Sequence, residues 1–127
     1  MKVTLRNIRE NLRPNQVGIT KDFINFLQKN VPLVDDILIN FVSKRNETIT
    51  TGKHIYGSLF VFTTSRILID ILRTLAHEWA HEYQDLQKKS NPKLEVPSEP
   101  HANALAGYLV RKFIEENPEH EVEANKD

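Results

Sequence analysis

Residues 74–84 have the sequence Thr-Leu-Ala-His-Glu-Trp-Ala-His-Glu-Tyr-Gln and contain the motif H-E-x-x-H, formed by His77, Glu78 and His81. Residues four apart lie on one face of a helix, so the two histidines can point their imidazoles at a common point. This arrangement suits Zn²⁺, which binds histidine nitrogen at about 2.0–2.1 Å. Glu78 projects about 100° further round the helix, where its carboxylate can take a proton from water beside the metal. The stretch therefore predicts a zinc site with Glu78 as general base.

The motif lies inside a longer helical pattern, which predicts a helix over residues 65–88 with Thr63 or Thr64 as its N-cap. Apolar residues recur at spacings of three and four and should face the core: Leu68, Leu72, Leu75, Trp79, Tyr83 and Leu86. A second, polar stripe carries the two histidines and should face a cleft: Asp70, Thr74, His77, His81 and Gln84. We expect Trp79 to pack in the core and not to contact a substrate.

The rest of the chain predicts an α+β fold. Residues 1–18 could form a short strand or a poor helix, ended by a break from Pro14 to Gly18. A helix should follow near residues 21–30, and β-branched and aromatic residues then predict three strands, over 37–43, 47–51 and 56–63. The last helix should begin at Ser98 or Glu99 and stop at Asn117-Pro118. The simplest arrangement is a small, mostly antiparallel sheet of about three strands packed on the long helix and the C-terminal helix.

Composition restricts the class of protein. A length of 127 residues suits one domain, which we place at residues 1–117, and residues 118–127 should form a charged, disordered tail. Lys plus Arg equals Asp plus Glu at 17 each, so no overall basic field favours nucleic acid. No cysteine is present for a disulfide or a cysteine-zinc site. The sequence has no apolar run long enough to span a membrane and no signal-peptide pattern, so we expect a cytoplasmic protein without a membrane partner.

A catalytic zinc ion needs a third protein ligand and one open position. The candidates are Glu95, Glu99 and His101. Glu99 is favoured because it begins the last helix, in register with the small residues Ala102 and Ala106 on the face turned toward the core. One turn later, Asn103 could hold the free nitrogen of His77, with Asp70 and Thr74 as alternatives. A donor for the oxyanion could come from four residues, among which the sequence does not choose: His54, Tyr56, Tyr83 and His101.

These residues resemble the zincin metallopeptidases, and specifically the gluzincins, in which H-E-x-x-H is completed by a downstream glutamate. Glu99 lies eighteen residues after His81, and Asn103 stands where gluzincins such as thermolysin carry an acid. The stretches Ala-His-Glu-Trp-Ala-His-Glu-Tyr-Gln and Glu-Pro-His-Ala-Asn-Ala-Leu-Ala are similar to compact ImmA/IrrE-type and phage-encoded metallopeptidases, over about residues 54–113. The resemblance implies a small sheet on the active-site helix, with the strand near 58–62 as the cleft edge that pairs with substrate backbone.

The resulting expectation is a metallopeptidase with one Zn²⁺ per chain, held by His77, His81 and Glu99, that hydrolyses peptide bonds in a protein or peptide substrate. A phage-encoded protein of this kind would act in the host cytoplasm. Peptide deformylase also carries H-E-x-x-H but adds a cysteine ligand, which this chain lacks. The alternative is a catalytically silent zincin-fold protein that acts as a binding or regulatory module, through its edge strand or acidic tail.

Overall fold

The computed structural model describes residues 1–43, 51–95 and 98–126, and the fold is α+β. The elements follow in the order β1 (Val3–Arg6), α1 (Ile8–Asn11), α2 (Pro14–Asn30), β2 (Ile37–Val42), β3 (Gly52–Ile55), β4 (Ser58–Phe62), α3 (Leu68–Ser90), α4 (Ser98–Glu116), a 3-10 helix (Pro118–His120) and α5 (Glu121–Ala124). Across these described residues, no helix has the length and apolar character that a membrane span requires.

Among the residues that the structure describes, the sheet has four strands in the order β1-β2-β4-β3 and is mixed. β1, β2 and β4 are parallel neighbours, and β3 alone pairs in the antiparallel sense, with β4. The predicted three-stranded, mostly antiparallel sheet was wrong in this respect. The reason is the connection between β1 and β2, because a helical crossover such as α1 and α2 returns the chain in the same direction.

The edge of the sheet also differs from the expectation. β4, which covers the strand near 58–62, lies between β2 and β3, so β3 forms that edge. A two-residue turn joins β3 to β4, and its Gly57 has φ of 81°, a conformation that glycine adopts without steric cost. The strand expected at 47–51 lies outside the described residues except for Thr51, and Gly52, expected to break it, begins β3.

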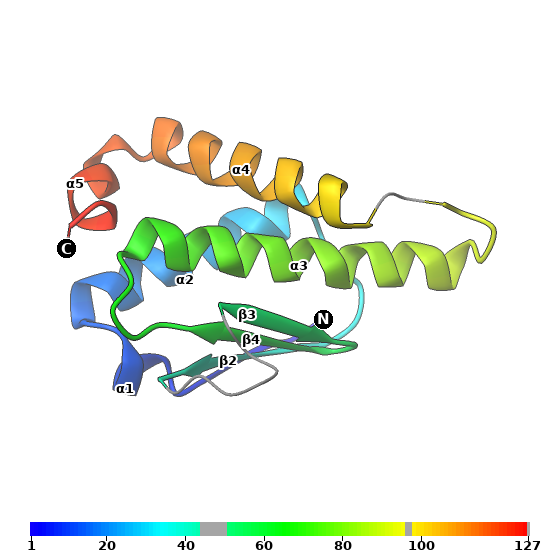
Figure 1. The fold of residues 1–127 in the computed structure, drawn as a ribbon, viewed down its shortest axis with the longest axis horizontal. Coiled ribbons are helices and arrows are strands. Elements are labelled where there is room, and N and C mark those ends of the chain that lie inside the picture. Colours follow the sequence, from blue (N-terminus) through cyan, green and yellow to red (C-terminus); the bar gives the residue numbers. More distant parts are fainter. Residues whose placement is uncertain (44–50, 96–97, 127) are drawn as a thin grey trace.

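One face of the sheet is covered by helices, and α3 lies along it (Figure 1). The buried residues of β2 alternate with half-buried ones, so one face of this strand points to the core. α3 packs against β3 and β4 on one side and against α4 on another, and α2 contacts α3 and α4. Trp79 of α3 is fully buried and donates its Nε1–H to the Val31 carbonyl at 2.8 Å. The prediction that Trp79 belongs to the core is therefore confirmed.

Two segments are more helical than the sequence suggested. α2 begins at Pro14 and includes Gly18, although we expected a break from Pro14 to Gly18. Proline is favoured in the first helical turn because its missing N–H would have no partner there. Residues 118–124, part of the tail expected to be disordered, form the 3-10 helix and α5. Ala124 of α5 is fully buried, and Glu123 pairs with Arg13 at 3.4 Å, so this end packs on the domain.

Candidate metal centre

Three side chains from two helices bring their ligand atoms together. His77 and His81, one turn apart on α3, have their Nε2 atoms 3.1 Å apart. Glu99, in the first turn of α4, places Oε1 2.8 Å from His81 Nε2 and Oε2 3.4 Å from His77 Nε2. Ligand atoms around a tetrahedral Zn²⁺ at 2.0–2.1 Å are separated by roughly 3.3–3.4 Å. Two imidazole nitrogens and a carboxylate at these separations therefore fit a zinc ion.

The close approach of α4 to α3 delivers Glu99 to this point. Ala102 and Ala106 are buried on α4, and their small side chains leave room for α3. The Glu99 side chain is 67% exposed, so solvent can reach the position that a metal ion's fourth ligand would take. The other candidates for the third ligand are engaged elsewhere. His101 Nδ1 accepts a hydrogen bond from Gln84 Nε2 at 2.8 Å, and Glu95 lies in the loop before α4 and lines a different cavity with Gln84.

Polar side chains lie beside both histidine rings, and hydrogen bonds hold the ring of His81. His81 Nδ1 lies 3.0 Å from Gln84 Oε1, which also accepts the Ser98 hydroxyl at 3.1 Å. A proton on Nδ1 leaves the Nε2 lone pair of His81 facing the cluster, as a metal ligand requires. Asn103 lines the cavity with His77, as the sequence suggested, and its side chain partly offsets the lowering of the His77 pKa. The role of Gln84 was not predicted, although its place three residues after His81 on the polar stripe was a usable signal.

Asp70 and Thr74, the alternatives to Asn103, take part in a different network of hydrogen bonds. Thr74 Oγ1 accepts a hydrogen bond from Arg66 at 2.7 Å, and the Asp70 carboxylate pairs with Arg73 at 3.2 Å. Arg66 also donates to the Phe62 carbonyl at 2.7 Å and to the Asp70 carbonyl at 3.0 Å. This network fixes the start of α3 against the end of β4 and leaves Asp70 and Thr74 without a role at the histidines.

Glu78 lies beside the donor atoms and is almost buried. One of its carboxylate oxygens is within 4.8 Å of the donor nitrogens of His77 and His81, and the residue is 7% exposed. Burial raises the pKa of Glu78 to about 7, with an opposing contribution from His81 and a further increase from Glu99. Burial and the neighbouring His81 lower the pKa of His77, which favours the neutral imidazole that binds a metal. A carboxyl group with a pKa near neutrality suits proton transfer in both directions.

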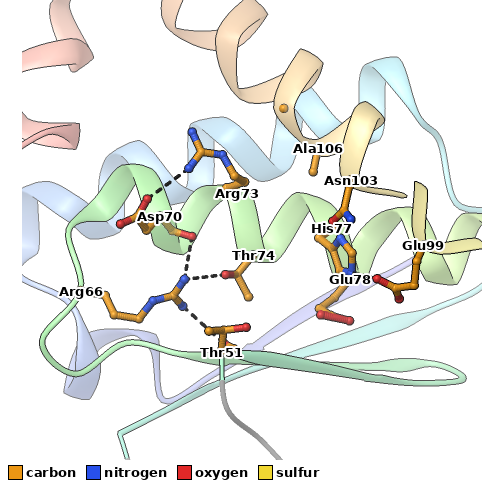
Figure 2. Close-up of a pocket in the computed structure, with 11 residues that line it drawn as sticks. Thr51, Arg66, Asp70, Arg73, Thr74, His77, Glu78, Glu99, Asn103 and Ala106 are labelled. Atoms are coloured by element: carbon orange, nitrogen blue, oxygen red, sulfur yellow. Dashed lines mark hydrogen bonds and ion pairs between the residues drawn. The ribbon is translucent and has the colours of Figure 1, made fainter. Parts of the chain in front are cut away.

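A cavity of about 500 Å³ opens beside these residues (Figure 2). His77, Glu78 and Glu99 lie at one end, and Arg66 and Asp70 lie at the other, along the first turns of α3. The full lining is Thr51, Arg66, Asp70, Arg73, Thr74, His77, Glu78, Glu99, Asn103, Ala106 and Gly107. The cavity has room for part of a peptide next to the candidate general base.

The residues considered for the oxyanion do not line this cavity. Tyr56 donates its hydroxyl to Asp35 at 2.8 Å, and the Tyr83 hydroxyl accepts a hydrogen bond from Gln87 at 3.0 Å. His54 Nε2 lies 2.7 Å from Glu82 Oε1, and the His54 and His81 ring centroids are 6.1 Å apart. The structure therefore does not single out an oxyanion donor among them.

None of the protein families, curated proteins or solved structures with which the chain was compared matches it. The resemblance to gluzincins thus depends on the H-E-x-x-H motif and its downstream glutamate. The geometry at His77, His81 and Glu99 is an independent observation, because nonlocal packing of α4 on α3 produces it.

Proposed function

We propose that this protein is a zinc-dependent peptidase. The observation that carries the proposal is the convergence of His77 Nε2, His81 Nε2 and the Glu99 carboxylate, at separations of 2.8–3.4 Å, beside the buried Glu78. His77, His81 and Glu99 would hold the ion, with one position open toward solvent. Zn²⁺ supplies Lewis acidity, which polarises a carbonyl group and acidifies water.

Glu78 is the residue that moves the proton in this proposal. Its carboxylate accepts a proton from the attacking water and returns it to the amine that leaves when the peptide bond breaks. Burial raises the pKa of Glu78 to about 7 in the metal-free chain, and a Zn²⁺ ion held nearby would favour the ionised carboxylate, which is the form that accepts the proton from water. Gln84 acts by orientation, because it holds His81 Nδ1 and so leaves His81 Nε2 toward the other ligand atoms. Asn103 lines the cavity beside His77 and would orient that imidazole in the same way.

The edge strand supports a peptide as the substrate. β3 pairs with β4 on one side, and it packs against α3, the helix that carries the motif. An edge strand presents backbone N–H and C=O groups on its other side, and an extended peptide can pair with them. A substrate bound in this way would run along α3 past Glu78.

The proposal is tested by metal content and cleavage together. Protein purified without chelator should contain a zinc ion that the substitution His77→Ala removes, as measured by mass spectrometry. Glu78→Gln should keep that zinc and lower the cleavage of a mixed peptide library by about 10²–10⁴-fold. Glu119→Gln, the same change on the exposed 3-10 helix, is the matched control and should leave both quantities unchanged.

Two results would contradict the proposal. One is undiminished cleavage by Glu78→Gln, which would remove Glu78 from the mechanism. The other is zinc-loaded wild-type protein that cleaves no peptide in the library, a result that would favour the binding-module alternative.

A further inference from the structure

A second cluster of metal-binding side chains lies between β3 and α3. His54 of β3 places Nε2 2.7 Å from Glu82 Oε1 and 3.6 Å from Asp85 Oδ2. One ligand atom from each of the three residues lies within 4.8 Å of the others. The cluster shares no residue with the His77, His81 and Glu99 site, although the His54 and His81 rings are stacked with centroids 6.1 Å apart.

Glu82 is the unusual member of the cluster, because it is a fully buried carboxylate. Its Oε1 accepts hydrogen bonds from both His54 and the Gly57 backbone N–H, the latter at 2.9 Å. Its Oε2 has no partner in the part of the chain that the structure describes. A buried carboxylate oxygen without a partner is costly, and a bound cation is one way in which proteins satisfy it. The peptidase proposal gives Glu82 no task.

We propose that His54, Glu82 and Asp85 form a second site for a divalent transition-metal ion. One imidazole nitrogen and two carboxylates are ligands that Zn²⁺ accepts, and the ion would replace the proton that His54 Nε2 shares with Glu82 and release it to solvent. Asp85 is 48% exposed, so an ion can enter from solvent on that side. The Gly57 N–H holds the Glu82 carboxylate in place, which is the kind of support that metal ligands usually have.

The ion would tie the edge strand to the motif helix. His54 comes from β3, whereas Glu82 and Asp85 come from α3. Binding there would fix β3 relative to the helix that carries His77 and His81. Because a metal that binds only the folded state stabilises it, the unfolding temperature should rise with zinc even when the first site is destroyed. This inference does not depend on peptidase activity.

The experiment uses the full chain with the double substitution His77→Ala/His81→Ala, which removes the first site. Calorimetric titration with Zn²⁺, together with metal analysis after dialysis, should give one zinc ion per chain and a higher unfolding temperature. Adding Glu82→Gln or Asp85→Asn should weaken zinc binding at least tenfold and abolish the temperature rise. Glu82→Gln is isosteric and keeps a carbonyl oxygen for the Gly57 N–H, so it tests the charge with the least change in packing.

Asp22→Asn in the same double-substituted chain is the matched control. Asp22 pairs with His120 at 3.3 Å elsewhere on the surface, so the change removes one carboxylate beside a histidine without touching the cluster. It should leave zinc binding intact. Absence of zinc binding by the double-substituted chain, while the wild type binds one ion, would overturn the second site and leave the first intact. Unaltered binding after both Glu82→Gln and Asp85→Asn would also overturn it.

Discussion

Gly52 begins β3 and lies against side chains of the motif helix. A Cβ atom added there would lie 2.5 Å from Thr74 Cγ2, 3.0 Å from Glu78 Oε2 and 3.1 Å from the Phe60 carbonyl oxygen. The first of these separations is too short, so Gly52→Ala must displace a neighbour. Thr74 cannot rotate away freely, because its Oγ1 accepts the hydrogen bond from Arg66 at 2.7 Å.

The expected cost follows from these contacts. Overpacking a buried contact costs about 1–3 kcal/mol, and replacing a strand glycine by alanine returns about 0.5–1 kcal/mol. Gly52→Ala should therefore lower the free energy of unfolding by about 1–2 kcal/mol. A displacement of the Glu78 carboxylate by about 1 Å should also reduce peptide cleavage by about 10²-fold. Urea unfolding of the chelator-treated protein measures the first quantity without knowledge of the substrate.

Two further variants isolate the steric cause. Gly18→Ala is the matched control, because a Cβ on this α2 glycine meets nothing within 4 Å; it should raise the free energy of unfolding by about 0.5–1 kcal/mol. Thr74→Ser removes Cγ2 but keeps the hydroxyl for Arg66. In that background the cost of Gly52→Ala should fall by about 1 kcal/mol. A Gly52→Ala protein as stable as the wild type, or an equal cost in both backgrounds, would refute the steric argument.

Two other predictions concern the histidine cluster. Glu78 has a pKa of about 7 in the folded chain against 4.5 as its ordinary value, so the folded state retains a proton that the unfolded state has lost, and stability falls as pH rises between these values. Raising the pH from 5 to 8 should therefore stabilise Glu78→Gln relative to the wild type by at most about 3 kcal/mol, measured by urea unfolding with chelator present. An equal difference in unfolding free energy between the two proteins at both pH values would argue against this prediction. Gln84→Ala removes the acceptor for His81 Nδ1 and should weaken zinc binding at the first site about 10–100-fold in competition with a chromophoric chelator. Gln87→Ala, the same change one turn later, should not, and equal losses in both variants would contradict the role of Gln84.

The expected and observed structures agree best where the interactions are local. The apolar stripe of the long helix and the buried Trp79 follow from spacings of three and four residues, and the structure confirms them. The expected start of the helix was wrong, because α3 begins at Leu68 with Ile67, not Thr63 or Thr64, at its N-cap. They agree least in the sheet, where the parallel pairing of β1 with β2 was missed. The sequence left residues 1–18 undecided between strand and helix, and the pairing of β1 depends on Ile37–Val42, more than thirty residues away.

The candidate site likewise has a part set by local helix geometry and a part set by nonlocal packing. The spacing of His77 and His81 carries its own geometry, because hydrogen bonds within one helix set the positions of residues four apart. From the sequence, Glu99 was the favoured one of three candidates for the third ligand. Its contact with both histidines depends on the packing of α4 against α3.

The amino-acid sequence alone determined the motif helix, the two histidines and the acid between them, since each is fixed by neighbours within a turn or two. The fold was needed to place β3 at the sheet edge, to bring Gly52 against Thr74, and to bury Glu82 beside His54, twenty-eight residues earlier in the chain. Such contacts depend on how separate elements share one core, and no local pattern encodes that choice.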